Sequence, residues 1–207
     1  EGAGRRRAER LLGMLMKGTA GIDAGTRQET MYLLGRHVFG SLTLDEQAKC
    51  RAFRLTVRRI LDLCAGERVD SLSFYYRAAM LGRLYRFVVE QELLHGGIAF
   101  DRPRPIAFFP GTFDPFTLSH KGVVRSIRDA GFEVLLAIDE FSWSKRTQPY
   151  RIRREIAAMS VADEFHVHIF PEDFPVNIAN PKNLKQLREA LPGRPVSIVV
   201  GSDVVVH

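Results

Sequence analysis

The chain has 207 residues, of which 45% are apolar and 26% charged, and its formal net charge is +6. This composition is typical of a globular protein with one large domain or two small ones. No apolar run approaches the roughly 18 residues that would span a membrane, and no secretion signal opens the chain. We therefore predict a cytoplasmic protein without a membrane partner, and a first residue other than Met leads us to expect a fragment.

The excess of positive charge lies in residues 1–105 and is densest at Arg5, Arg6 and Arg7. Such a patch could meet nucleic acid or an acidic partner. No interleaving of aromatic and basic residues accompanies it, so solvated helix faces are the favoured interpretation and nucleic acid is a disfavoured partner. Cys50 and Cys64 would lie too far apart on one helix to form a disulfide, and we expect reduced thiols.

The first half of the chain has the pattern of helices. Residues 5–17 predict a helix that ends at Gly18, and residues 18–42 predict a mixture of helix and loop. Thr43 followed by Glu46 is typical of a capping box at the start of the next helix. That helix would carry one apolar stripe. The stripe comprises Phe53, Val57, Ile60 and Cys64.

A second long helix is predicted over residues 71–95, with Gly96 and Gly97 ending it. Apolar residues at helical spacing predict its inner face, and we interpret them as core rather than as a cofactor site. They are Tyr76, Met80, Leu84, Phe87 and Leu94. The two prolines in residues 101–105 then favour an extended connector. We predict an all-α domain over residues 1–104, without an assigned role, and a second domain over residues 105–207.

The second half alternates short apolar runs with helical segments. The runs cover residues 106–109, 133–138, 165–170 and 196–200, and the helical segments cover 118–130, 150–161 and 181–191. This alternation predicts an α/β fold with a parallel, Rossmann-like sheet, incomplete at the C-terminus. Ligands of such sheets bind beyond the carboxyl ends of the strands. Three polar segments fall there: residues 110–120, 139–149 and 201–203.

The most informative stretch is the predicted strand, polar loop and helix start within residues 106–122. Backbone N–H groups and the positive end of the helix dipole converge at such a place and can hold phosphate. The loop reads Gly111-Thr112-Phe113-Asp114-Pro115-Phe116-Thr117-Leu118-Ser119-His120.

This loop resembles the first signature of the nucleotidyltransferase superfamily with an (H/T)xGH motif. That superfamily includes nicotinate and nicotinamide mononucleotide adenylyltransferases, phosphopantetheine adenylyltransferase and small cytidylyltransferases. The matching residues are Gly111, Phe113, Asp114, Pro115, Thr117 and His120. Ser119 stands where the family has Gly, which would let a ligand approach the backbone closely. The resemblance covers residues 105–207 only.

The resemblance implies transfer of AMP or CMP from ATP or CTP to a phosphate-bearing acceptor, with release of pyrophosphate. Such chemistry needs alignment and donors for charge on the phosphate oxygens, rather than a protein nucleophile. His120 would donate to these oxygens and Thr117 would hold a phosphate. Nucleotide contacts would come from Gly111, Thr112, Phe113, Asp114 and His120. Mg²⁺ is implied by the triphosphate, and no metal ligands are predicted in the chain.

Cationic residues follow the second predicted strand. Lys145 resembles the lysine of the family's loop and would act in catalysis. Arg146, together with Arg153 or Arg154 in the next helix, could hold the triphosphate or an acidic group of the substrate. Trp143 could stack on a ring. The alternative interpretation is a solvated basic helix start, with Trp143 packed in the structure.

Gly201 and Asp203 resemble a G-x-D segment that lies near the nucleotide in the pyridine-nucleotide enzymes. Thr117 instead resembles the phosphopantetheine branch, so the acceptor stays open between them. His166 and His168 alternate along a predicted strand, and we interpret them as structural.

The family's second signature, a helix start that holds the β- and γ-phosphates, does not occur before His207. We therefore expect this chain to bind nucleotide weakly and turn over poorly, and a longer parent protein to be active. Two other functions stay open. One is a non-catalytic nucleotide-binding or scaffold protein whose basic helical module recognises a partner or nucleic acid. The other is a class I aminoacyl-tRNA synthetase fragment, against which residues 111–115 and the lack of a KMSKS-like segment argue.

Overall fold

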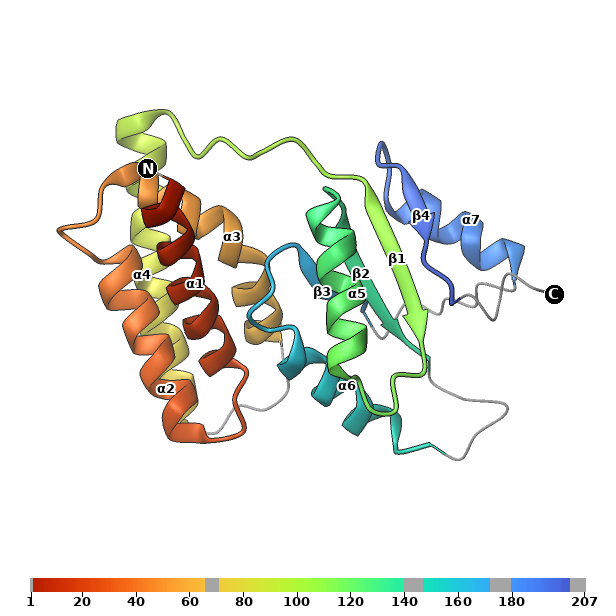
Figure 1. Cartoon of the computed structure of the whole chain (residues 1–207). Helices are drawn as coiled ribbons and strands as arrows, with labels where there is room; N and C mark the ends of the chain where they lie inside the picture. Colours follow the sequence, from red (N-terminus) through yellow and green to blue (C-terminus); the bar gives the residue numbers. More distant parts are fainter. Residues whose placement is uncertain (1, 66–70, 140–146, 172–179, 202–207) are drawn as a thin grey trace. The chain divides into compact units, whose positions relative to one another are not determined.

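The computed structural model describes residues 2–65, 71–139, 147–171 and 180–201. The chain forms two compact units, Glu1–Asp101 and Arg102–His207, which are coloured in sequence order in Figure 1. The division falls at the start of the proline-containing stretch of residues 101–105. Among the described residues, no helix is both long and apolar enough to cross a membrane.

The first unit is helical. Its helices are α1 (Gly2–Thr19), α2 (Ala24–Leu33), the π-helix η1 (Leu34–Phe39), α3 (Glu46–Ala65) and α4 (Ser71–His95). Each has buried apolar side chains, because an amphipathic helix is stable only when its apolar stripe is covered. The buried residues include Leu12, Met16, Met31, Leu34, Phe39, Phe53, Ile60, Met80, Leu84 and Phe87.

Several predictions for this unit need correction. The first helix begins at Gly2 rather than at residue 5. Asp45, not Thr43, caps α3, since its Oδ1 accepts the N–H of Ala48 at 2.7 Å. Leu94 was predicted in the core but is 72% exposed, because it lies in the last turn of α4. The predicted end of α4 is confirmed by Gly96 and Gly97, whose φ angles of 73° and 99° leave the helical region.

The second unit alternates strands and helices as predicted. Its elements are β1 (Ile106–Gly111), α5 (Leu118–Asp129), β2 (Glu133–Ile138), α6 (Tyr150–Ser160), β3 (Val167–Ile169), α7 (Pro181–Ala190) and β4 (Val196–Ile198). All pairings are parallel, in the order β3-β2-β1-β4, so the mixed α/β class is confirmed. β3 starts later than predicted because His166, with φ +61°, cannot continue a strand.

Helices cover both faces of the sheet. One face packs against α5 and α6 through Val134 and Leu136 of β2, and Val124 and Ala157 of those helices. The other face packs against α7 through a second cluster of buried residues. That cluster contains Ile106, Phe108, Leu135, Phe170 and Leu187. Alternate residues of β2 therefore serve opposite layers, as the two-residue period of a strand requires.

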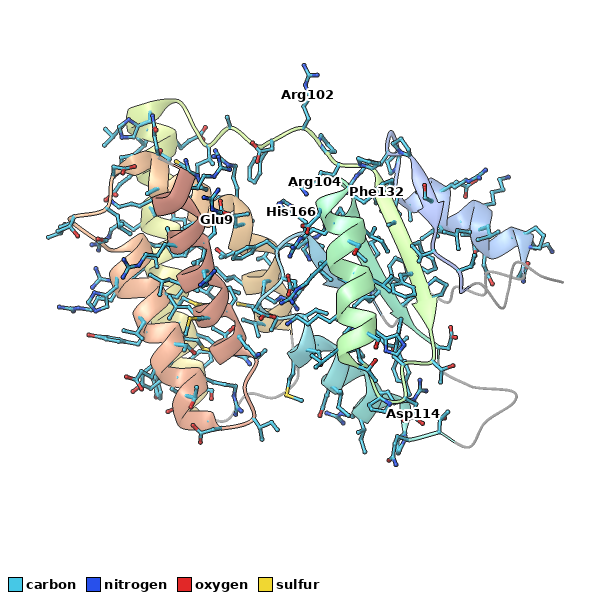
Figure 2. All side chains as sticks on the ribbon, viewed as in Figure 1. Glu9, Arg102, Arg104, Asp114, Phe132 and His166 are labelled. Carbon is cyan, nitrogen blue, oxygen red and sulfur yellow. The ribbon has the colours of Figure 1, made fainter. Side chains whose placement is uncertain are left out.

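The two ends of the sheet have different chemistry. At the amino end of the strands, Glu133 accepts from Arg194 at 2.6 Å and lies 3.2 Å from Nε2 of His168. Arg194 also donates to the carbonyl of Arg104. Figure 2 shows Arg104 and His166 at this end, and Asp114 at the opposite end. The carboxyl ends of the strands are therefore the place to look for a ligand site.

Candidate functional site

The loop of residues 112–117 leaves the sheet where its strand order reverses. β2 and β3 lie on one side of β1, whereas β4 lies on the other. In open parallel sheets, ligands bind outside the carboxyl end of the strand at which this reversal occurs. Gly201 follows β4 and is exposed, and β4 is aligned parallel to β1. The loop after β1 thus occupies the position that parallel topology favours for binding.

Thr117 and His120 form a reciprocal cap at the start of α5. The Thr117 backbone N–H donates to Nδ1 of His120 at 3.0 Å, and the Thr117 side chain accepts from the His120 N–H at 3.5 Å. A backbone N–H can only donate, so Nδ1 must be the acceptor. We infer that the neutral ring carries its proton on Nε2. The cap thus leaves His120 with an Nε2–H donor at a helix N-terminus.

Aromatic rings fix the orientation of this imidazole. The ring of His120 lies 5.2 Å from that of Phe113, edge to face, and 5.4 Å from that of Phe116. Both phenylalanines are 5% exposed. Phe113 has φ +45°, a left-handed conformation that is costly for a non-glycine residue. Such backbone strain tends to occur at functional sites, where the surrounding structure holds it in place.

Asp114 joins this loop to the segment before α6. Its exposed carboxylate accepts the Gln148 N–H through Oδ2 at 3.0 Å. The two segments border a hollow of about 600 Å³. Its lining includes Asp114, Pro115, Thr147, Gln148 and Ile156. This hollow has the size of a small-molecule site and lies beside the His120 loop.

Arg153 does not lie where a substrate could reach it. Its side chain is 1% exposed and donates to three backbone carbonyls: Gln148 through Nε at 2.9 Å, Asp139 through Nη2 at 2.8 Å, and Thr112 through Nη1. The predicted contact between Arg153 and a substrate is therefore corrected. The sequence does contain a signal for burial, because Arg153 shares a helical face with Ala157 and Val161, which are both 0% exposed.

Arg154 and Asp139 lie at the same end of the sheet. Arg154 is half-buried and donates to the carbonyl of Phe170, the residue after β3, at 2.7 Å. Burial raises the pKa of the Asp139 carboxyl, and the positive charge of Arg153 opposes that rise. Arg154 thus binds the chain just after β3, and only part of its side chain is exposed.

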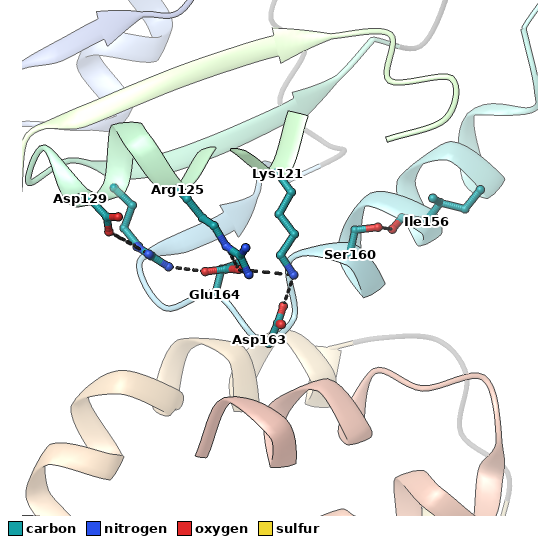
Figure 3. A network of polar contacts seen from close by, with 8 residues as sticks. Lys121, Arg125, Asp129, Ile156, Ser160, Asp163 and Glu164 are labelled. Carbon is teal, nitrogen blue, oxygen red and sulfur yellow. Dashed lines mark hydrogen bonds and ion pairs between the residues drawn. The ribbon is translucent and has the colours of Figure 1, made fainter. Parts of the chain in front are cut away.

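A network of charged side chains holds α5 in place (Figure 3). Lys121, the residue after His120, is 8% exposed and contacts Asp163 at 2.6 Å. Glu164 lies 3.4 Å from Lys121 and accepts from Arg125 at 2.6 Å and from Arg128. These ion pairs tie α5 to the turn before β3, which fixes the helix whose N-terminus carries His120.

The other predicted site residues differ in their placement. Gly111 ends β1, and Thr112 follows it with its carbonyl held by Arg153. Trp143, Lys145, Arg146 and Asp203 lie outside the described residues. Gln148 was not predicted as a site residue, because it contributes through its backbone N–H and C=O, which do not depend on the residue type.

The described residues supply hydrogen-bond donors rather than a metal centre. Within residues 2–65, 71–139, 147–171 and 180–201, no group of three or more His, Cys, Asp or Glu side chains could hold a metal ion. No protein-family model matches this chain, and no curated protein matches it in sequence. The donors at the α5 N-terminus suit an anion, and the adjoining hollow suits a small molecule.

Proposed function

We propose that this protein is a nucleotidyltransferase with a Rossmann-like domain, which transfers AMP or CMP from ATP or CTP to a small phosphate-bearing acceptor. The observation that carries the proposal is the reciprocal cap between Thr117 and His120. The cap uses Nδ1 of His120 as an acceptor, so Nε2 carries the ring proton, and the loop that leads into α5 contributes Asp114 and Pro115 to a hollow at the carboxyl end of β1.

In the proposed reaction, an acceptor phosphate oxygen attacks the α-phosphorus of the nucleoside triphosphate. A new P–O bond forms, and the bond from the α-phosphorus to the bridging α–β oxygen breaks. The electron pair leaves with pyrophosphate, and the nucleotidyl group becomes part of a phosphoanhydride. Alignment and charge stabilisation suffice for such a step, so no covalent enzyme intermediate is required.

His120 has the main electrostatic task in this proposal. Its Nε2–H would donate to a non-bridging phosphate oxygen as negative charge grows there, assisted by free N–H groups in the first turn of α5. The Thr117 hydroxyl lies 2.9 Å from Nδ1 of the same ring. We therefore assign Thr117 the task of orienting the imidazole.

The remaining proposed roles concern the ligand's surroundings. The loop of residues 111–114 would contact the nucleotide, and Gly201 would lie beside it after β4. Arg154 would add positive charge near the phosphates through the exposed part of its side chain. Lys145, Arg146, Trp143 and Asp203 keep their sequence-based roles as proposals.

Mg²⁺ would accompany the triphosphate. This ion commonly keeps several water ligands and takes only one or two protein carboxylates besides substrate phosphates. Asp114 suits that requirement, because it is exposed at the hollow and only its Oδ2 accepts the Gln148 N–H. Bound there, the ion would supply charge neutralisation for the phosphate oxygens.

The experiment measures two quantities on the full chain: ATP or CTP binding in Mg²⁺ buffer, and pyrophosphate release with pyridine mononucleotide or phosphopantetheine as acceptor. We expect slow acceptor-dependent pyrophosphate release, in keeping with the poor turnover expected for this chain, and a further fall of about 10²–10³-fold in His120→Ala. His95→Ala, which changes an exposed histidine at the end of α4, serves as the matched control and should leave release unchanged.

Three outcomes would count against the proposal. Binding of neither nucleotide at millimolar concentration would reject a nucleotide site. Binding without pyrophosphate release would favour the non-catalytic nucleotide-binding alternative, which the serine at position 119 already suggests. Pyrophosphate release that is unchanged in His120→Ala would show that the imidazole takes no part in the reaction.

A further inference from the structure

Arg153 binds three segments of chain that come together at the carboxyl end of the sheet. Its Nη1 reaches the carbonyl of Thr112 after β1, its Nη2 that of Asp139 after β2, and its Nε that of Gln148 before α6. A planar guanidinium presents donors in fixed directions, so one side chain can set the spacing of several acceptors. Two of these carbonyls follow strands at the carboxyl end of the sheet, and the third belongs to Gln148, which lines the hollow.

The charge of Arg153 is buried, and its hydrogen bonds to the three carbonyls offset the cost of that burial. The side chain is 1% exposed, and its Cζ lies 6.0 Å from the centroid of the Tyr150 ring. Burying a charged group is costly unless it is hydrogen-bonded, and an apolar residue would fill a core position at lower cost. Ala157 in α6 and Val161, the C-cap residue of that helix, follow Arg153 at four-residue intervals and are both 0% exposed, so this face belongs to the core.

Both backbone polar groups of Gln148 are hydrogen-bonded. Its N–H donates to Asp114 and its carbonyl accepts from Arg153. Arg153 also reaches Thr112, two residues before Asp114, so the loop after β1 and the segment before α6 are joined by both contacts. Any shift of the guanidinium would therefore change the distance across the hollow that both segments border.

We propose that Arg153 is a positioning residue, which acts through the backbone of Thr112, Asp139 and Gln148 to hold the walls of the candidate site at the spacing that the ligand requires. This inference rests on the proposed function for the nature of that ligand. In this proposal Arg153 does not bind the ligand directly. It fixes the positions of the backbone segments that surround the ligand. A misplacement of about 1 Å can cost about 10²-fold in rate, so such control has a measurable effect.

The test compares Arg153→Lys with Arg194→Lys. Arg194 is a matched control because it also donates to a backbone carbonyl and lies in the same unit, but at the amino end of the strands. Lysine keeps the charge and loses the planar fork. We expect similar falls in Tm for both variants, whereas only Arg153→Lys should lower kcat, by about 10²-fold.

Amide hydrogen exchange gives a readout that needs no nucleotide. The amides of Asp139 and Gln148 donate to Gly111 and Asp114, so their exchange reports the spacing that Arg153 is proposed to set. We expect exchange at both to rise about tenfold in Arg153→Lys relative to the amide of Val134, and to stay unchanged in Arg194→Lys. If Arg153→Lys does not fold, Arg153→Gln, which buries no charge, replaces it in both measurements.

The outcomes separate this inference from the proposed function. Equal acceleration of exchange at Asp139, Gln148 and Val134 would show a loss of global stability and would overturn the positioning role. Unchanged exchange with reduced kcat would overturn it as well, because it would indicate direct contact with the ligand. If wild type transfers no nucleotide but exchange changes as expected, the proposed function fails and the role of Arg153 in setting the site stands.

Discussion

The backbone N–H of Thr117 donates to Nδ1 of His120, and this one bond joins the stability of α5 to the chemistry proposed for its N-terminus. In an ordinary capping box, Glu or Gln at the third helical position accepts this N–H. A histidine there accepts with one ring nitrogen and keeps the other as a donor. The T-x-x-H spacing thus has two physical consequences, a helix start and an oriented N–H.

These two consequences can be separated by substitution. His120→Ala removes the oriented N–H and the half of the cap that Nδ1 makes, so we expect a loss of about 1 kcal/mol in the free energy of unfolding, as for a weakened cap. Its transferase rate should fall about 10²–10³-fold. His120→Gln can still accept the Thr117 N–H, so its stability should stay within about 0.5 kcal/mol of wild type. Urea denaturation and pyrophosphate release measure the two effects.

The transferase rate of His120→Gln shows whether His120 donates to the ligand or only caps α5. We expect it to fall nearly as far as that of His120→Ala, because a glutamine amide cannot occupy the position of Nε2 while its oxygen serves the cap. Wild-type activity in His120→Gln would show that the residue acts only as a cap.

Because Glu164 is buried in the charge network of α5, removing its charge should cost more stability than removing the charge of an exposed glutamate. The Glu164 side chain is 5% exposed and contacts Lys121, Arg125 and Arg128. Glu164→Gln should lower the free energy of unfolding by about 1–3 kcal/mol, because hydrogen bonds to charged groups are lost in a partly buried place. Chemical denaturation provides the measurement.

Glu189→Gln is the control for that network. Its side chain is 63% exposed, and its carboxylate lies 3.7 Å from Nζ of Lys185 in the preceding turn of α7. Exposed pairs of this spacing contribute less than about 0.5 kcal/mol. Equal losses in the two variants would mean that the contacts around Glu164 contribute no more than a surface pair does.

Most of the α/β unit could be predicted from local patterns. The strand at residues 133–138 is a short apolar run, and its bounds match the structure. The helix expected over residues 118–130 ends one residue earlier, where Gly131 with φ +96° stops it. Both signals act within a few residues, which is why the sequence reveals them.

The features that could not be predicted depend on contacts between distant segments. The burial of Arg153 has a signal in its helical spacing from Ala157 and Val161, but its carbonyl partners Thr112 and Asp139 have none, because they follow strands that are distant in sequence. The backbone of Gln148 contributes through groups that every residue has. The short β3 reflects the conformation of His166, which residue type alone does not specify.

His166 predicts a pH dependence of stability. Burial lowers the pKa of this imidazole from 6.5, and the charge of Arg104 adds to that effect. The unfolded chain therefore binds a proton at a higher pH than the folded chain does. The contribution to stability is fully present above about pH 6.5 and is lost as pH falls toward the folded-state pKa. Urea denaturation from about pH 7.5 to about pH 5.5 covers this window.

The control for His166 is His166→Asn, since asparagine tolerates a positive φ. Other groups nearby also titrate or carry charge, among them Glu133, His168 and Arg128. The difference between wild type and the variant largely cancels their contribution. We expect wild type to lose stability relative to His166→Asn as the pH falls. A difference that does not change with pH would contradict a lowered pKa.

Gly111 provides the sharpest test of how the loop supports His120. A Cβ at this position would lie 2.9 Å from Cζ of Phe113, which is too close for the ring to stay in place. Phe113 in turn packs against His120, so Gly111→Ala should displace the imidazole without touching it. We expect transferase activity to fall about 10²-fold. Gly122→Ala, in α5, is the control because its Cβ meets nothing within 4 Å, and alanine should stabilise the helix by up to about 1 kcal/mol.

A second substitution checks the mechanism of that loss. Phe113→Leu shortens the side chain that Gly111→Ala would strike, so the double variant should recover part of the activity that Gly111→Ala loses. Pyrophosphate release by the two single variants and the double variant gives the coupling between these positions. Additive losses would show that residue 111 acts through its own contact with the ligand rather than through the Phe113 ring.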